Sequence, residues 1–328
     1  MKIIRHYQEV PEGCRHAVTA IGNFDGVHRG HRALIERART LATRRQVPLA
    51  ALAFEPHPQE YFRPQEEHFR LTPFRTKARL LAENRLDILF ALPFDGHMAG
   101  KTAEAFVREI LVDSLQIQGV VVGADFRFGK GRAGDTALLG QLGRELGFEV
   151  DIFAPVLNGE IKISSSEIRA ALKDGRPEKA AELLGHWWSV EGRVEHGNAR
   201  GRQLGYPTAN LPMDGYLRPA FGVYGVRASV VENDCVISSH HGVASIGIRP
   251  MFRVEEPLLE VHLFDFNDDL YGKHLSVEFV AYLRPEASFD SIDRLKKQMA
   301  DDATAARALL DQNLRTLTAQ SAATRPQL

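Results

Sequence analysis

The 328-residue sequence contains only two cysteines, Cys14 and Cys235, which lie far apart and show no metal-ligand spacing. So few cysteines exclude a disulfide framework and favour a reducing cytoplasm. No hydrophobic run approaches about 18 residues and the first residues lack the apolar core of a signal peptide, so we expect no membrane partner. The net charge of −1 gives no electrostatic basis for general nucleic-acid binding.

The remaining composition is that of a soluble globular protein, with 44% hydrophobic and 25% charged residues. Residues 17–184 alternate short apolar segments with amphipathic helical patterns. This alternation predicts an α/β domain whose parallel sheet is covered by helices on both faces. The expected strands are Ala17–Ile21, Leu49–Phe54, Ile88–Leu92, Val120–Val122 and Phe148–Phe153, and the expected helices lie near 31–45, 73–84, 102–114 and 135–146.

The pattern changes after Gly185. Segments rich in β-formers follow one another, and helical periodicity returns only after Ser291, which predicts an antiparallel β-barrel closed by a C-terminal helix. The expected strands are Trp187–Glu195, Gly222–Val231, Val236–Ile246, Leu258–Phe264 and Leu275–Leu283. We therefore expect two domains, residues 1–184 and 185–328.

The run from Gly22 to His31 has the features of a phosphate site. It lies between an apolar strand and an amphipathic helix, so its glycines let a ligand approach the backbone and the helix N-terminus favours an anion. His28 and His31 are three residues apart, and in a first helical turn both would donate hydrogen bonds to a polyphosphate from one side. A capped helix start with surface histidines is the alternative. The other residues of the run that we assign to phosphate binding are Gly22, Phe24, Asp25, Gly26 and Gly30.

Further segments of the first domain accompany this run. Ser164 and Glu167 fit a capping box at a serine-rich helix start, and that start, followed by an arginine, also suits a triphosphate. The loop 123–132 follows a strand directly and carries Phe128, either as a core residue or as a stacking surface for a planar ligand. The turn 54–58 contains two prolines, which form flat apolar walls at low entropic cost.

The second domain has two segments that suit chemistry. A loop beginning at Gly201 and Arg202 can wrap phosphates with its backbone N–H groups. Thr208 and Asn210 share one face of an extended segment, where their oxygens suit Mg²⁺, although turns use both residue types freely. Glu260 lies on an alternating strand and is either a solvent-facing side chain or a general base for a substrate hydroxyl.

The segments of the first domain resemble the adenylyltransferase module of bacterial bifunctional riboflavin kinase/FAD synthetases, a Rossmann-like nucleotidyltransferase. The residues that the resemblance places on the ATP phosphates are His28, His31, Ser165, Ser166 and Arg169. It places Asp125, where some members carry Asn, near the nucleotide. The residues that it places around the flavin are Pro56, Pro58, Phe62 and Phe128.

The second domain resembles the riboflavin kinase module of the same family over nearly all of 185–310. The supporting segments are Gly222–Tyr224, Gly242–Gly247, Asp269–Lys273, Leu283–Pro285 and Phe289–Ser291. The resemblance implies that Thr208 and Asn210 hold Mg²⁺, that Glu260 is the base, and that Arg284 belongs to a flavin-side loop. Met251 stands where the family usually has Thr.

We therefore predict a cytoplasmic bifunctional enzyme that phosphorylates riboflavin to FMN with MgATP and adenylylates FMN to FAD with a second ATP, releasing pyrophosphate. Small-molecule substrates are its expected partners, and we expect a monomer or a weak homo-oligomer. One alternative is a single-activity enzyme: a kinase with a silent first module, or an adenylyltransferase for another substrate such as pantetheine phosphate. The other alternative is a non-enzymatic regulator that binds a flavin or a nucleotide.

Overall fold

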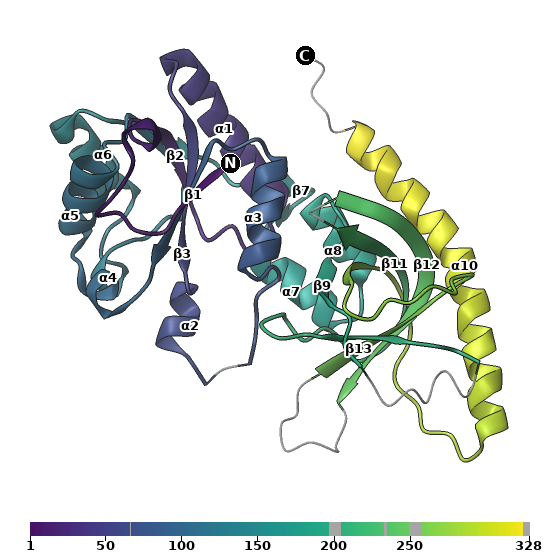
Figure 1. Ribbon diagram of the computed structural model, residues 1–328. Helices are drawn as coiled ribbons and strands as arrows, with labels where there is room; N and C mark the ends of the chain where they lie inside the picture. The colour runs from purple at the N-terminus through teal and green to yellow at the C-terminus, as the bar shows by residue number, and fades with distance from the viewer. Residues whose placement is uncertain (66, 197–204, 233–234, 249–256, 324–328) are drawn as a thin grey trace. The chain divides into compact units, whose positions relative to one another are not determined.

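The chain folds into two compact units (Figure 1). The computed structural model describes residues 1–65, 67–196, 205–232, 235–248 and 257–323. The first unit is formed by Met1–Glu66 and Thr72–Ile163, and the second by Glu67–Leu71 and Ser164–Leu328. The short Glu67–Leu71 segment therefore interrupts the first unit and packs with the second.

The first unit is built on a six-stranded parallel sheet in the order β1-β4-β3-β2-β5-β6. Its strands are β1 (Lys2–Ile4), β2 (Val18–Ile21), β3 (Leu49–Glu55), β4 (Ile88–Pro93), β5 (Gly119–Gly123) and β6 (Glu149–Phe153). The strand order reverses at β2, which pairs with β3 on one side and β5 on the other. In open α/β sheets, ligands bind outside the carboxyl ends of the strands at such a reversal.

Helices cover both faces of this sheet, which confirms the predicted α/β class (Figure 1). The helices are α1 (Arg29–Arg45), α2 (Pro58–Phe62), α3 (Phe74–Glu83), α4 (Gly96–Gly100), α5 (Ala103–Ala105), the π-helix η2 (Phe106–Ser114) and α6 (Thr136–Leu146). Successive strand residues point to opposite faces, so Ala51 packs with α1 and α3, whereas Leu52 packs with η2 and α6. Burial on both faces is what a parallel sheet requires.

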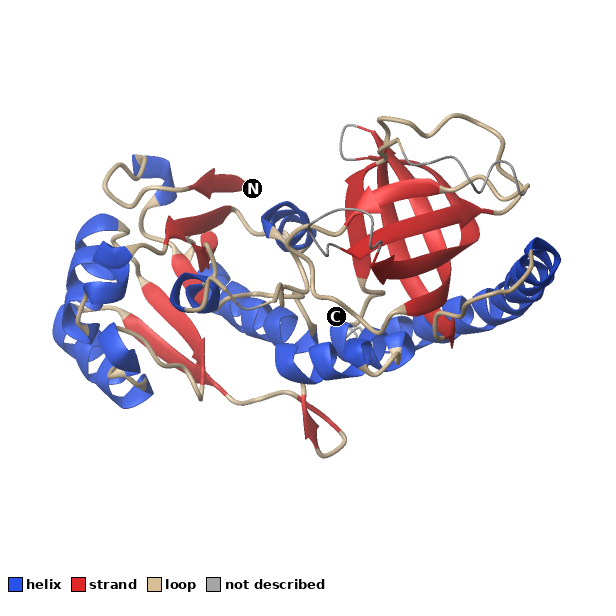
Figure 2. Cartoon of the chain, turned by 90° about the horizontal axis from the view of Figure 1, so that it is seen from below, coloured by secondary structure: helices blue, strands red, loops and turns tan. Residues whose placement is uncertain are grey.

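Short elements complete the first unit. They are the 3₁₀ turns η1 (Glu12–Cys14) and η3 (Lys130–Arg132) and the hairpin of β7 (Leu157–Asn158) and β8 (Ile161–Lys162). Figure 2 shows this hairpin extending away from the edge of the sheet. Its second strand leads directly into the serine-rich segment.

The second unit contains an antiparallel, near-closed barrel, as predicted (Figure 2). Among the described residues its strand order is β10-β13-β12-β11-β14-β9. The strands are β9 (Ser189–Arg193), β10 (Ala209–Pro212), β11 (Gly222–Glu232), β12 (Cys235–Ile248), β13 (Pro257–Leu263) and β14 (His274–Arg284). The two ends of the sheet are joined by an isolated bridge, in which the Glu195 N–H donates to the Asn210 carbonyl at 2.9 Å.

Three helices pack with the barrel in the described part of the second unit. They are α7 (Ser165–Lys173), α8 (Pro177–Leu184) and α10 (Ile292–Ala323). Figure 1 shows α10 along the outside of the barrel, and its Ala306 and Leu310 form a buried cluster with Val280 of β14. Gly175, between α7 and α8, has a φ of +67°, and a Cβ there would lie 3.1 Å from the Tyr282 ring. Because α7 and α8 belong with the barrel, the continuous C-terminal part of the second unit begins at Ser164, upstream of residue 185.

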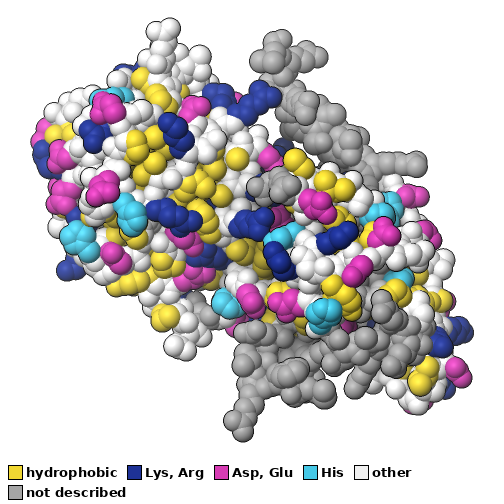
Figure 3. All heavy atoms as spheres, viewed as in Figure 1, with side chains coloured by type: hydrophobic (Ala, Val, Ile, Leu, Met, Phe, Trp, Pro, Cys, Tyr) yellow, Lys and Arg dark blue, Asp and Glu magenta, His cyan; other side chains and the backbone are white. Residues whose placement is uncertain are grey.

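On the face shown in Figure 3, acidic and basic side chains are intermixed over both units, with hydrophobic side chains between them. In the part of the chain that the structure describes, no helix combines the length and the apolar character that crossing a membrane requires.

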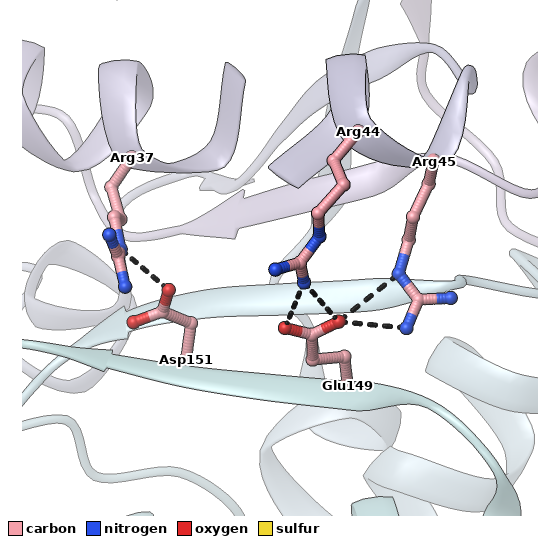
Figure 4. A network of polar contacts seen from close by, with 5 residues as sticks. All are labelled: Arg37, Arg44, Arg45, Glu149 and Asp151. Carbon is pink, nitrogen blue, oxygen red and sulfur yellow. Dashed lines mark hydrogen bonds and ion pairs between the residues drawn. The ribbon is translucent and has the colours of Figure 1, made fainter. Parts of the chain in front are cut away.

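An ion-pair network joins α1 to the edge strand β6 (Figure 4). Arg44 and Arg45 contact the Glu149 carboxylate at 2.6 and 2.8 Å, and Arg37 contacts Asp151 at 2.6 Å. The hydrogen bond from Arg45 lowers the pKa of Glu149, and Arg44 acts in the same direction. Charges along an edge strand also oppose its pairing with another chain.

The Glu149→Gln variant tests this network. Because the folded-state pKa lies below the ordinary value of about 4.3, the stabilising contribution of Glu149 is present above that value and is lost as the pH falls through the folded-state pKa. We expect the variant to be less stable by no more than about 1 kcal/mol near neutral pH, and the difference to shrink in acid. Urea unfolding across the pH range measures this.

The exposed Glu160→Gln variant controls for the loss of one carboxylate. If Glu149→Gln and Glu160→Gln follow the same pH dependence, the network does not stabilise the folded state.

Thr19 provides a second test of the first unit. It is fully buried in β2, and its Oγ1 contacts no hydrogen-bond partner within the described residues. A buried unsatisfied hydroxyl costs roughly 1–3 kcal/mol. We therefore expect Thr19→Val to raise the free energy of unfolding by roughly 1 kcal/mol, measured by urea denaturation. A loss of stability would contradict this interpretation.

Candidate functional sites

Three loops meet at the carboxyl-end edge of the first sheet. They follow β2, β5 and β3, which are neighbouring strands. The loop after β2 contains the 22–31 run, the loop after β5 contains Asp125, and β3 leads into the prolines at 56 and 58. The structure therefore gathers segments that are separated by about a hundred positions in the sequence, at the place where the strand order reverses.

The turn between β2 and α1 has a constrained backbone. Phe24 and Val27 have φ values of 51° and 41°, and Gly26 has a φ of 84°. A positive φ is uncommon outside glycine, and for a β-branched residue it is an outlier that persists only where surrounding contacts determine it. Phe24 and Val27 are both fully buried, so packing contributes to fixing the turn.

The two histidines lie at the N-terminus of α1. His28 is the N-cap residue, and its Nδ1 accepts a hydrogen bond from the His31 N–H at 3.2 Å. Since Nδ1 is the acceptor, a neutral His28 carries its proton on Nε2. The rings stack with centroids 3.6 Å apart and planes 15° apart, so both lie on the same side, as their spacing predicts. A Cβ at Gly30 would lie 3.1 Å from the His28 ring, which makes a side chain there unfavourable.

Asp25 is held inside the same turn. Its side chain is buried, and its Oδ1 accepts a hydrogen bond from the Thr72 N–H at 3.0 Å. The Thr72 hydroxyl lies 3.3 Å from this oxygen and accepts the Gly26 N–H at 2.9 Å. Nothing in the sequence pointed to Thr72, which is distant from the turn and belongs to no motif that we recognised.

Asp125 forms an ion pair that was not foreseen. Lys162 Nζ, at the end of β8, lies 2.5 Å from Asp125 Oδ2. The hydrogen bond from Lys162 lowers the pKa of Asp125. The lysine therefore offsets the negative charge of Asp125. Lys162 lies two residues before Ser164, and this closeness to the serine-rich segment is the signal that could have identified the lysine.

The turn after β3 is fixed by prolines, a helix cap and an ion pair. Pro58 opens α2, where its missing N–H is not needed. His57 caps this helix by accepting, at Nδ1, an N–H from two residues further on. The buried Lys77 lies 3.2 Å from Glu55, the residue before Pro56. A wall formed by the two prolines would therefore be held in place from both sides.

Aromatic side chains lie beside this turn. The rings of Tyr61, Phe62 and Phe94 contact each other edge to face, with centroids 5.2–5.7 Å apart. Phe62 is 64% exposed, so its ring is open to a planar ligand. Phe128 is only 7% exposed and stacks on Phe126 at 5.4 Å, so most of its ring is covered by protein.

The serine-rich helix start belongs to the second compact unit. Ser164 caps α7 by accepting the Glu167 N–H at 3.3 Å, as the capping-box pattern predicts. Ser165 and the following serine form the first turn. Arg169 Nε donates to the Phe69 carbonyl at 2.7 Å, and the guanidinium lies 5.0 Å from the Phe69 ring centroid. This contact orients Arg169 and ties α7 to the Glu67–Leu71 segment.

A second candidate site lies across β10 and β13 of the barrel. The antiparallel register places Asn210 directly opposite Glu260, and directly opposed residues share one face of a sheet. Thr208, two residues before Asn210, precedes the strand. Leu259 and Val261 point to the other face and are buried, as the alternation predicts. Asn210 and Glu260 therefore come together, although 50 positions separate them in the sequence.

Asn210 has an unusual environment in this site. The residue is only 5% exposed, and its Oδ1 has no hydrogen-bond partner among the described residues. Buried side-chain oxygens normally have a partner, so this oxygen suits a ligand that accepts its lone pairs. No group of three or more His, Cys, Asp or Glu that could hold a metal occurs in the described ranges. A cation here would need the Thr and Asn oxygens together with substrate oxygens.

Arg284 is engaged by the last helix. Its Nε and Nη2 contact the Asp302 carboxylate at 2.9 and 2.8 Å, and Gln298 donates to the same carboxylate at 2.9 Å. The side chain thus ties the end of β14 to α10, and the guanidinium also lies 5.8 Å from the Phe289 ring centroid.

Three residues singled out in the sequence lie outside the described residues: Gly201, Arg202 and Met251.

Comparisons with known proteins match both units. The FAD synthetase family matches residues 10–167 and the riboflavin kinase family matches residues 184–310. A bifunctional riboflavin kinase/FMN adenylyltransferase of Escherichia coli K12 is 42% identical over 94% of this chain and 97% of its own length. Its Pseudomonas fluorescens counterpart is 39% identical over 94% and 98%.

A crystal structure described as a macrolide-efflux protein from Streptococcus pneumoniae shares the fold, with a TM-score of 0.81 and 31% identity over 93% of this chain and 98% of that one. The curated relatives match across both modules, which does not support a single-activity enzyme or a non-enzymatic regulator. The chain belongs to the bifunctional riboflavin kinase/FMN adenylyltransferase family, and it phosphorylates riboflavin to FMN and adenylylates FMN to FAD.

Proposed function

We propose that Glu260 is the general base of the riboflavin kinase reaction. Its carboxylate takes the proton of the riboflavin ribityl hydroxyl while that oxygen attacks the γ-phosphorus of ATP and ADP leaves. The observation that carries this proposal is the pairing of Glu260 with Asn210 across β10 and β13. The pairing puts an acid–base group and a metal-binding oxygen on one face.

Thr208 and Asn210 would hold Mg²⁺ in this site. The buried Asn210 Oδ1, which accepts no hydrogen bond from the described residues, supports the assignment. Hard oxygen ligands combined with phosphate oxygens suit this ion. Bound there, Mg²⁺ would neutralise charge on the ATP phosphates. Gly201 and Arg202 are proposed to contact the same phosphates, and Arg284 to support the flavin side through its link between β14 and α10.

Adenylyl transfer is assigned to the turn at the carboxyl end of β2. The FMN phosphate attacks the α-phosphorus of ATP, and pyrophosphate leaves; no protein base is needed because the attacking phosphate is already anionic. His28 and His31 donate hydrogen bonds to the phosphates as charge develops, and the α1 N-terminus adds its positive end. The stacked pair at that N-terminus supports this role. The further residues proposed for the nucleotide are Gly22, Phe24, Asp25, Gly26, Gly30, Asp125, Ser165, Ser166 and Arg169.

The flavin of this reaction is proposed to lie against the turn after β3. Pro56 and Pro58 provide a wall, and the exposed ring of Phe62 provides a stacking surface. Phe128 contributes from the loop after β5, where its mostly covered ring supports that of Phe126. Substrates with planar rings suit such apolar surfaces.

We also propose an adenylyltransferase domain of residues 1–184 and a kinase domain of residues 185–328. The family matches at 10–167 and 184–310 support this division, while α7 and α8 pack with the barrel. A cytoplasmic location is supported by the unpaired thiols of Cys14 and Cys235. We propose a monomer or a weak homo-oligomer.

Replacing one proposed catalytic residue in each unit should separate the two activities. We expect His28→Ala to lower FMN-to-FAD turnover by roughly 100-fold or more, because a preorganised donor to the transition state is lost. We expect Glu260→Gln to lower riboflavin-to-FMN turnover by roughly 100-fold or more. Chromatography of FMN and FAD, with separate assays of ADP and pyrophosphate, measures both.

Each variant serves as the folding control for the other. His28→Ala should retain the kinase rate, and Glu260→Gln should retain adenylylation of added FMN. Full turnover of both reactions in both variants would refute the assignments.

Removal of a proposed metal ligand should affect only the kinase. We expect Asn210→Ala to raise the Mg²⁺ concentration that half-saturates FMN formation by roughly 10-fold or more. Adenylylation of added FMN, titrated with the same Mg²⁺ series, is the control and should not change. An unchanged Mg²⁺ dependence of FMN formation would remove Asn210 from the metal site.

A further inference from the structure

A threonine distant in the sequence is bonded into the phosphate turn. Thr72 and the turn exchange hydrogen bonds in both directions: its N–H and hydroxyl face Asp25 Oδ1, and its Oγ1 accepts the Gly26 N–H. Both Thr72 and Asp25 are only 3% exposed. Hydrogen bonds shielded from water, with a charged carboxylate as one partner, are among the stronger ones in proteins.

These bonds act on the strained part of the turn. Asp25 and Gly26 lie between Phe24 and Val27, the two residues of this turn other than glycine whose φ values are positive. Such conformations persist only where their surroundings determine them. Val27 precedes His28, so the conformation that Thr72 fixes leads directly into the N-cap of α1.

The backbone of Thr72 is itself restricted within the first unit. Pro73 follows it and is the N-cap residue of α3, which limits the conformations of Thr72. The division between the two compact units falls between Leu71 and Thr72, so Thr72 belongs with the turn and with α3 in the first unit. A residue restricted in this way can impose its geometry on the turn rather than adapt to it.

We propose that Thr72 is a positioning residue for adenylyl transfer. Through Asp25 and Gly26 it holds the backbone that presents His28 to the reacting phosphates. This inference rests on the proposed role of His28. Thr72 acts through the turn and contacts no reacting atom, so its loss should lower turnover by misplacing the donors.

The test compares three variants of the full-length protein. Thr72→Val removes the hydroxyl and keeps the shape, and Thr72→Ser keeps the hydroxyl. Thr19→Val removes another buried threonine hydroxyl from the same unit, one that makes no hydrogen bond to the described residues. The kcat and KM for FMN adenylylation, the kcat for riboflavin phosphorylation and the thermal midpoint are measured for each.

We expect Thr72→Val to lower the adenylylation kcat by roughly 10- to 100-fold, with riboflavin phosphorylation unchanged. Thr72→Ser and Thr19→Val should both stay within about 3-fold of wild type, because serine keeps the hydroxyl and the Thr19 hydroxyl makes no hydrogen bond to the described residues. Unfolding of the whole chain would lower both reactions, and an unchanged thermal midpoint excludes unfolding of the first unit as the cause of the split.

Unchanged adenylylation in Thr72→Val would overturn the proposal, as would an equal loss in Thr72→Ser. If Thr72→Val also loses kinase activity, Thr72→Ala is measured instead, because it removes the hydroxyl without adding an apolar methyl. Equal losses of both reactions in Thr72→Ala would show a role in folding alone and would also overturn it. Failure of His28→Ala to affect adenylylation would separately remove the proposed function.

Discussion

The reversal of strand order at β2 is the constraint on which the first site depends. Since β2 pairs with β3 on one side and β5 on the other, three loops from distant parts of the chain share one edge of the sheet. The loop after β2 then enters α1 through a buried turn with two positive φ values outside glycine. Thr72 is hydrogen-bonded to this turn, Phe24 and Val27 are buried in it, and a pair of stacked imidazoles follows at the N-terminus of α1.

In the barrel, strand register brings the site residues together. The antiparallel pairing of β10 with β13 sets Asn210 opposite Glu260, so a one-residue slip would move one of them to the other face. The bridge between Glu195 and Asn210 closes the sheet at the same residue. In both proposed sites, backbone geometry thus determines which side chains lie together.

Much of this arrangement could be predicted because it depends on local periodicity. Alternation of apolar strands and helices indicated the parallel sheet, and the Ser164 cap followed from its spacing to Glu167. The short strands β1, which has three residues, and β10, which ends at a proline, could not be predicted from periodicity. The expected helix 102–114 is present, but it is divided between α5 and η2. Thr72 and Lys162 also escaped notice, since their partners Asp25 and Asp125 are 47 and 37 residues away and long-range pairs leave no local pattern.

One chain carries out two separate reactions in sequence. Incubating the purified wild-type protein with riboflavin and MgATP and following FMN, FAD, ADP and pyrophosphate over time tests this order of reactions. Formation of FAD accompanied by both ADP and pyrophosphate, with FMN formed before it, is the predicted result. Accumulation of FMN with ADP alone, or no flavin product at all, would contradict the account.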